Sequence, residues 1–391
     1  MREFLRRHKQ LLVYSITVVL SITILIVGGI WAQYTPPFTG QVSLDVTAVV
    51  TQVVDVKEES YELSGEQGSF ETRTIAFRAR ITSGELKGLE VTGYQQQDSL
   101  LAGAPKDVEA GDKVLITFTD MGEGTDEWLF MDYHRSDALL WLAGVFLLLL
   151  VLFGRRQGVN TIVSLVFTVL AVFVVFVPSI LRGKNIYVMA AAVCLFCTLS
   201  TLLIVSGWSK KTLCASAGCV GGLVTTGLVT LFMSHVMHLT GMVDSNAMYL
   251  SASFEDITID LKAVIFGAIL VGALGAVMDV AMSLSSALRE VAEQMGEKRS
   301  YRVLVRSGMT IGRDIMGTMA NTLILAYIGS SLSVVLLLVA SADSMLSLFN
   351  REMIVVEVMQ ALAGSLGILS TIPITSLLAS WVYTRPGSHK K

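Results

Sequence analysis

Long runs of apolar residues recur along the chain, and each is long enough to cross a bilayer. A membrane-spanning helix needs about 20 predominantly apolar residues. The pattern therefore predicts a polytopic α-helical membrane protein with about eight spans. We expect these spans at Leu11–Trp31, Ala138–Phe153, Val159–Leu181, Ile186–Gly207, Leu213–Leu239, Leu261–Ser285, Ile315–Ala340 and Ile354–Tyr383.

The stretch between the first two spans has a different pattern, in which apolar and polar residues alternate. Period-two alternation is typical of strands with one buried face. The turn-forming stretches SGEQGS, SGELKG and EAGD lie between several of these strands. Five short strands in about 100 residues predict a small all-β domain. We expect a barrel or a sandwich, and an OB-like barrel is one of the possible architectures. The strands are expected at 42–56, 72–81, 88–95, 112–120 and 126–133.

The two patterns divide the chain into four parts. We expect an N-terminal membrane anchor at 1–31, an extracytoplasmic β-rich domain at 32–137, a seven-span membrane domain at 138–383 and a cytoplasmic basic tail at 384–391. The first apolar segment is close to 20 residues long, whereas a signal-peptide core has about 7–15. Ile30 would occupy the −3 position before Ala32, where a cleavage site needs a small residue. We therefore interpret this segment as an uncleaved anchor.

Composition agrees with a membrane protein and excludes other classes. Hydrophobic residues make up 53% of the chain and charged residues 16%, where soluble proteins carry roughly a quarter charged residues. The missing charge is absent from the long apolar runs, which argues against a soluble enzyme and against a disordered chain. The net charge of −3 argues against nucleic acid as a partner, because a nucleic-acid binder carries a basic face.

The distribution of Lys and Arg predicts the orientation in the membrane. Cytoplasmic segments carry an excess of these residues near the span ends. With the N-terminus inside, seventeen lie on the inner side and four in short outer loops. Both termini are therefore expected in the cytoplasm. Arg182 and Lys184 oppose the rule, but a re-entrant third segment that kept them inside would move the whole Arg289–Arg313 cluster outside.

Polar residues within the spans are the candidate functional residues, because a charged side chain in a bilayer is costly. Asp279 lies in the sixth predicted span and Asn321 in the seventh, at a similar depth if consecutive spans run antiparallel. One interpretation is a cation or proton site on a transport path. The other is interhelical hydrogen bonding that holds the helices together. Thr318, Thr322, Arg313 and Asp314 complete the candidate site.

Other residue types suggest no further chemistry. Cys194 and Cys197 form a C-x-x-C within an apolar run, where buried thiols act as small apolar residues. His235 and His238 have a spacing that a metal could use, but two histidines without a third ligand do not make a site. We find neither a metalloprotease nor a nucleotide-binding motif in any span. We therefore expect no enzyme activity, no cofactor and no bound metal.

Two long segments carry a resemblance to a known family. GAILVGALGAVMDVAMSLSSAL at 267–288 and SGMTIGRDIMGTMANTLILAYIG at 307–329 resemble the YibE/F family of bacterial multi-pass membrane proteins. The anchor, the strand-rich domain and the following spans are similar to the YibE-like organisation, so the resemblance covers nearly the whole chain. It implies a membrane location and a permease-like character. It implies no particular substrate and no catalytic residues.

Two functions follow from these observations. The leading hypothesis is a permease-like protein that moves a small solute or ion, alone or within a complex. The alternative is a non-transporting assembly factor or sensor, whose outer domain binds an envelope or membrane protein. The expected partners are therefore the lipid bilayer, such a protein, and a small solute or ion.

Overall fold

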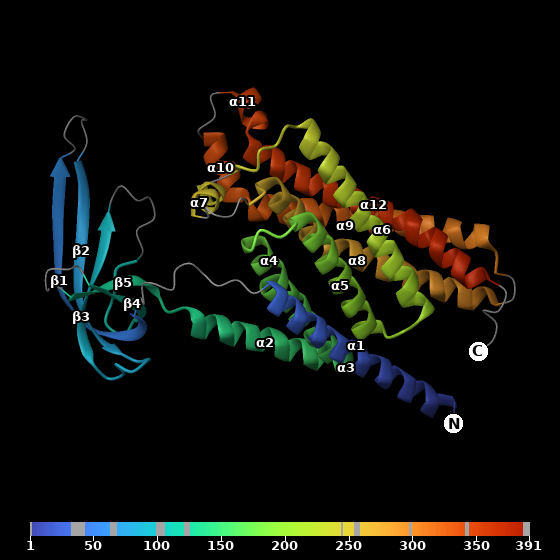
Figure 1. Ribbon diagram of the computed structural model, residues 1–391, viewed down its shortest axis with the longest axis horizontal. Coiled ribbons are helices and arrows are strands. Elements are labelled where there is room, and N and C mark those ends of the chain that lie inside the picture. The colour runs from blue at the N-terminus through green and yellow to red at the C-terminus, as the bar shows by residue number, and fades with distance from the viewer. Residues whose placement is uncertain are drawn as a thin grey trace. The chain divides into compact units, whose positions relative to one another are not determined.

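The computed structural model describes residues 2–32, 44–62, 69–98, 106–120, 126–243, 245–253, 259–296, 299–340 and 344–385. The chain separates into two compact units. One consists of Met1–Tyr34 with Leu150–Lys391 and contains most of the helices, and the other is Thr35–Leu149, which contains the strands (Figure 1). Helix α2 (Ser136–Gly154) runs across the boundary between the units, and none of its residues is buried.

The strand unit is a closed five-stranded barrel, which confirms the predicted β-rich domain. The strands are β1 (Leu44–Glu62), β2 (Ser69–Ile81), β3 (Glu90–Asp98), β4 (Lys113–Asp120) and β5 (Asp126–Tyr133). Their order around the barrel is β1-β2-β3-β5-β4, with β1 paired to both β2 and β4. The β3–β5 pair is parallel and the others are antiparallel. This closed small barrel is compatible with the OB-like architecture.

The barrel has its own apolar core, made by the inward-facing residues of the alternating pattern. Phe77 is completely buried, and Trp128 belongs to the same core cluster. A Cβ at Gly93 would lie 2.7 Å from the Phe77 ring, so the absence of a side chain at Gly93 leaves room for this ring. Phe130 and Tyr133 are partly buried and pack against the cluster.

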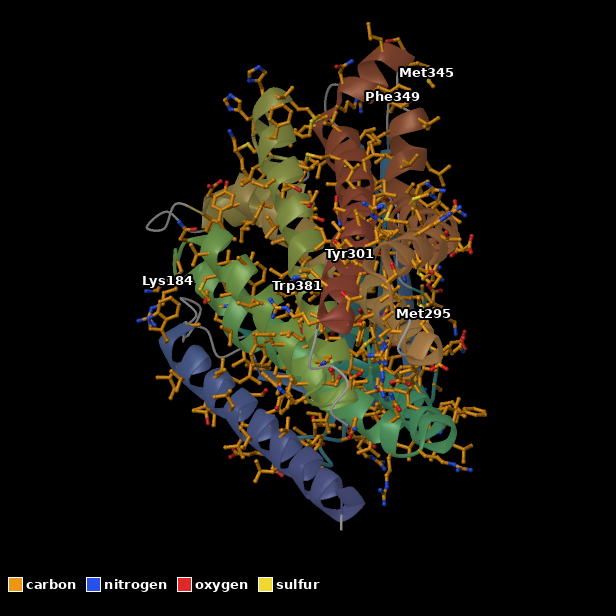
Figure 2. The ribbon with its side chains drawn as sticks, turned by 90° about the vertical axis from the view of Figure 1, so that its right-hand side faces the viewer. Lys184, Met295, Tyr301, Met345, Phe349 and Trp381 are labelled. Carbon is orange, nitrogen blue, oxygen red and sulfur yellow. The ribbon has the colours of Figure 1, made fainter. Side chains whose placement is uncertain are left out.

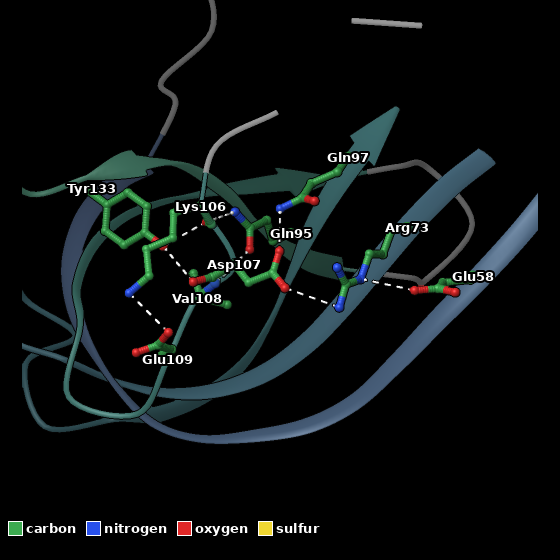
Figure 3. Close-up of polar contacts among 9 residues, drawn as sticks. All are labelled: Glu58, Arg73, Gln95, Gln97, Lys106, Asp107, Val108, Glu109 and Tyr133. Carbon is green, nitrogen blue, oxygen red and sulfur yellow. Dashed lines mark hydrogen bonds and ion pairs between the residues drawn. The ribbon is translucent and has the colours of Figure 1, made fainter. Parts of the chain in front are cut away.

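A buried glutamine fixes the segment that precedes β4 to the barrel (Figure 3). Gln95 on β3 is fully buried; its Nε2 donates to the Lys106 carbonyl oxygen at 3.0 Å and its Oε1 accepts from the Val108 amide at 3.0 Å. The Tyr133 hydroxyl donates to the Lys106 and Asp107 carbonyl oxygens at 2.8 and 2.9 Å. These bonds satisfy backbone groups that no strand pairs.

The helical unit is built from long apolar helices. Within the described residues, seven helices of the chain are long and apolar enough to cross a membrane, or eight if one bent pair counts as a span. The chain is therefore a multi-pass membrane protein. The bounds are α1 (Arg2–Ala32), α3 (Arg156–Leu170), α5 (Ile186–Ser206), α6 (Lys210–Val236), α7 (Ser245–Ser253), α8 (Leu261–Met295), α9 (Tyr301–Ser330), α10 (Leu332–Ala340), α11 (Met345–Asn350) and α12 (Glu352–Thr384).

One of these spans contains a π-helical turn. After α3 the helix continues through η1 (Ala171–Phe176) and α4 (Val177–Leu181) without a break, so that Arg156–Leu181 forms one span. In η1 the backbone bonds reach one residue further than in an α-helix. Such turns occur mostly as short insertions in α-helices and are frequent at functional sites.

Helix α12 occupies the centre of the unit, where it packs against α6, α8 and α9 (Figure 1). Small residues make the close contact with α6 possible. A Cβ at Gly222 would lie 2.9 Å from the Gly367 carbonyl oxygen, and a Cβ at Gly218 would clash with the Thr375 hydroxyl. Close backbone approach through small residues is the usual means by which membrane helices associate.

The helices of the last spans differ in extent from the expected apolar segments. The helix of the expected span Ile315–Ala340 begins earlier, at Tyr301, and the chain bends by 62° between α9 and α10. Helices α8 and α9 extend beyond the expected spans and include most of the residues from 287 to 313. Helix α12 contains Pro373 and continues through it from Glu352 to Thr384.

Candidate functional site

Asp279 lies on an exposed stripe of α8, together with Gly272 and Gly275. The residues on either side of this stripe, Val277 and Val280, are completely buried in the helical core. A Cβ at Gly275 would meet nothing within 4 Å, so there is open space beside the carboxylate. The Asp279 side chain therefore projects from the packed helices although it belongs to a membrane span.

The polar residues of α9 also form an exposed face. Asp314, Thr318 and Asn321 follow one another at intervals of one helical turn, and all three are exposed. Gly317 lies between them, and a Cβ there would also meet nothing within 4 Å. The two remaining candidates, Arg313 and Thr322, are exposed beside this face.

The hydroxyl groups of this face are already engaged within α9. The Thr318 hydroxyl donates to the Ile315 carbonyl oxygen at 3.0 Å, and the Thr322 hydroxyl donates to the Thr318 carbonyl oxygen at 2.8 Å. Such bonds are the default for threonine in a helix. Among the described residues, the Asn321 amide and the Asp279 and Asp314 carboxylates have no hydrogen-bond partner, so they stay available for a solute or ion.

Two contacts define how α8 and α9 are aligned. A Cβ at Gly308 would lie 3.1 Å from the Leu288 side chain, and a Cβ at Gly272 would lie 2.7 Å from the Tyr327 hydroxyl oxygen. Counting along the antiparallel helices from these contacts puts Asp279 level with the turn Gly317–Asn321. Among the described residues, however, no hydrogen bond or ion pair joins Asp279 to a side chain of α9. The structure aligns the candidate residues on one face and leaves that face open. We call Asp279, Gly275, Gly317, Thr318 and Asn321 the polar face.

Sequence reasoning missed two residues at the end of the polar face. Tyr327 of α9 lies against Gly272, and the Gln360 Nε2 lies 3.5 Å from the same Cβ position. Side chains of α9 and α12 therefore meet there, against the glycine of α8. Glu357 is half-buried one turn before Gln360 on α12. A glutamine in an apolar span was a visible signal, but the sequence does not show which helices meet.

Buried hydroxyl groups line the inside of α12. The side-chain oxygens of Thr375, Ser376 and Ser380 are buried and have no hydrogen-bond partner within the described chain. A Cβ at Gly308 of α9 would lie 2.6 Å from the Ser376 hydroxyl oxygen. The contacts among α6, α9 and α12 are thus partly polar, unlike the exposed side of α12, which carries Leu362, Leu366 and Leu377.

The remaining residues singled out in the sequence are placed as follows. All four cysteines are free and buried. His238 lies beyond the end of α6 with a φ of 52°, so it does not share a helical face with His235. In the part of the chain that the structure describes, no three His, Cys, Asp or Glu side chains form a group that could hold a metal ion.

Comparison with known proteins identifies the membrane part of the chain. A search of curated proteins and a search of solved structures each found no match. Residues 142–385 match the family described as YibE/F-like protein. The matched region is more than half of the chain and contains α8, α9 and α12, which carry the polar residues described above. The chain therefore belongs to the YibE/F-like family.

Proposed function

We propose that the protein is a permease-like transporter of a small solute or ion, and that the polar face of α8 and α9 forms part of the path. Asp279 carries this proposal. Its carboxylate projects from a membrane helix beside the open space at Gly275 and Gly317. An exposed carboxylate in a span is costly against lipid, so such residues almost always face water or protein.

The polar face offers chemistry that suits a cation or a proton. A carboxylate in a poorly hydrated site either takes up a proton or binds a cation, and both change its charge. The Asn321 amide at the same level offers an oxygen to a cation and an N–H to a carboxylate. Asp279 would thus couple ion movement to the solute.

The charge distribution gives the proposed path a direction relative to the cell. The Lys and Arg counts favour a cytoplasmic position for both termini and for the Tyr301 end of α9, with the barrel outside. Arg313 and Asp314 would then lie toward the cytoplasmic mouth, and Tyr327 and Gln360 closer to the outer surface. The barrel would lie where a solute or an envelope protein arrives.

A non-transporting assembly factor or sensor is the second candidate. The barrel favours it, because Thr35–Leu149 forms a compact unit with a core of its own. In this case another membrane protein would cover the polar face, and Asp279 would hydrogen-bond across that interface. The two functions differ in whether Asp279 must change its charge.

Ion flux in sealed vesicles tests the proposal. We would follow proton entry with an entrapped pH dye, and sodium entry with radioactive sodium, under an imposed membrane potential. We expect flux above that of protein-free vesicles, and its loss in Asp279→Asn, which keeps the shape of the side chain. Glu290→Gln is the matched control, because Glu290 is an exposed carboxylate about three turns along the same face of α8. Full flux in Asp279→Asn, or no flux in the wild type, would contradict the proposal and favour the assembly factor.

A further inference from the structure

An apolar groove runs between α1 and the span that contains the π-helical turn. Its volume is about 510 Å³, and residues from α1 and from η1 with its flanking turns line it. Gly29 and Ile30 lie at the end of α1, and Pro178 lies at the end of the span, so the groove opens toward the ends of both helices. Leu25, Ile26, Leu170 and Val174 complete the lining.

Two glycines and the π-helical turn shape this groove. A Cβ at Gly29 would lie 2.9 Å from the Val174 side chain, and a Cβ at Gly28 would lie 3.1 Å from Val175. The two helices therefore touch at the glycines. Beside this contact the surface is hollow and consists of aliphatic side chains, of which Ile30 is 66% exposed. In a bilayer, such a surface meets the acyl chains of lipids.

Two cations gather at the open end of the groove. Arg182 Nη1 donates to the Trp31 carbonyl oxygen at 2.8 Å, and Lys184 Nζ lies 4.4 Å from the centre of the Trp31 ring. Figure 2 shows Lys184 at the end of α1. These are the same two cations that oppose the positive-inside rule. A role at the groove would explain why these two cations lie on the outer side, which the positive-inside rule does not explain.

Among the described residues, the acidic side chain that lines a pocket with Lys184 is Asp260, and it has other partners. Its carboxylate accepts from the Ala263 amide at 3.2 Å and from the Tyr187 hydroxyl at 3.4 Å. The Lys184 ammonium and the exposed Arg182 guanidinium thus keep donors available for an anion. An arginine with a lysine is a common combination for binding phosphate.

We propose that this groove binds one acyl chain of an anionic phospholipid, and that Arg182 and Lys184 hold the lipid phosphate. The apolar lining accounts for the chain and the two cations account for the charge of the headgroup. A protein helix suits the groove less well than an anionic lipid, because the helix would also need a free negative charge to pair with the two cations. Helix α2 is the apolar helix next to the barrel, and its one acidic residue, Asp137, already pairs with Lys113 at 2.6 Å.

Lipid retention by the purified full-length protein tests this site. The protein would be reconstituted with equal amounts of phosphatidylglycerol and phosphatidylethanolamine, extracted in mild detergent, and analysed by native mass spectrometry. We expect preferential retention of phosphatidylglycerol. The double variant Arg182→Gln/Lys184→Gln should lose this preference by about fivefold for each charge removed. Its control is Arg155→Gln/Arg156→Gln, which removes two cations at the other end of the same span.

A second pair of variants tests the groove itself. Ile30→Trp fills the groove and should reduce retention of phosphatidylglycerol, whereas Leu20→Trp, at an exposed position of α1 outside the groove, should not. Thermal unfolding would verify that all variants fold. An unchanged preference in Arg182→Gln/Lys184→Gln or in Ile30→Trp would overturn the proposal. So would displacement of the lipid by inorganic phosphate, or a disulfide between Ile30→Cys and Phe146→Cys, which would show α2 in the groove.

Discussion

The hydroxyl oxygen of Tyr327 on α9 occupies the space that a side chain at Gly272 of α8 would need. A Cβ at Gly272 would lie 2.7 Å from this oxygen, which is closer than carbon and oxygen atoms pack. The contact holds α8 and α9 in the register that puts Asp279 level with Gly317–Asn321. The alignment of the polar face therefore depends on a glycine that sequence patterns identify only as a small residue.

Replacing Gly272 by alanine should destabilise the membrane unit. The new methyl group must displace the Tyr327 ring, and overpacking of this kind costs about 1–3 kcal/mol. Denaturant unfolding of the detergent-solubilised protein would measure the loss. Gly275→Ala is the matched control one turn away on the same stripe, because a Cβ there meets nothing within 4 Å.

The double variant Gly272→Ala/Tyr327→Phe shows whether the clash causes the loss. Removing the hydroxyl group removes the atom that a Cβ would strike, so much of the stability should return. Equal unfolding of Gly272→Ala and Gly275→Ala would show that the alignment of α8 and α9 is different.

The barrel should fold without the membrane helices. Residues 38–135, expressed alone, are expected to form a β-rich monomer that melts cooperatively, because their core closes without a disulfide or a metal. In this domain Gln95→Leu should cost about 1–3 kcal/mol, since the Val108 amide loses its buried acceptor. Circular dichroism during thermal unfolding measures both. Gln96→Leu, at the exposed neighbouring position, should change stability little, and a mainly helical spectrum would contradict the fold.

Tyr133 gives the barrel a predicted response to alkaline pH. Burial raises the pKa of the Tyr133 hydroxyl, and the nearby Asp112 carboxylate raises it further. Because the folded pKa lies above the unfolded one, the stability from Tyr133 is present below about pH 10 and is lost as pH rises through the folded pKa. The difference in melting temperature between wild type and Tyr133→Phe should therefore shrink above that pH. A constant difference would show that the hydroxyl does not titrate with unfolding.

The sequence predicts most of the fold because apolar runs and alternating strands reflect local physics. Strands β4 and β5 begin within one residue of their expected positions, since their alternation determines which face is buried. The size of the bend between α9 and α10 could not be predicted. Ile315–Ala340 is one apolar stretch without proline, and Gly329–Ser331 is a local signal for a kink but not for its size. Conversely, Pro373 does not interrupt α12, and proline within a membrane helix is generally tolerated in a packed bundle.

The candidate site could be predicted less completely. Asp279 and Asn321 are visible in the sequence as polar residues within apolar runs. The contact of Tyr327 with Gly272, and the approach of Gln360, depend on which faces of three helices meet. Helical periodicity indicates a face but not its neighbour, so these residues emerge only from the packed structure.

The orientation can be tested by labelling single cysteines in intact cells. The four native cysteines are buried, so background labelling should be low. Lys87→Cys in the barrel and Gln294→Cys near the end of α8 introduce exposed thiols. A membrane-impermeant maleimide should label Lys87→Cys in intact cells and Gln294→Cys only after permeabilisation, because the Lys and Arg excess lies on the inner side. The reverse result would invert the proposed topology.

The accessibility of position 321 to water tests the proposed path most directly. A thiol reacts with charged methanethiosulfonate reagents as the thiolate, which forms in water and not in lipid or in a dry protein interface. We predict that Asn321→Cys, in reconstituted vesicles, reacts rapidly with such a reagent, and that Leu377→Cys on the apolar exposed side of α12 does not. If Asn321→Cys were as unreactive as Leu377→Cys, the polar face would be covered by lipid or protein, and a solute path along α8 and α9 would be contradicted.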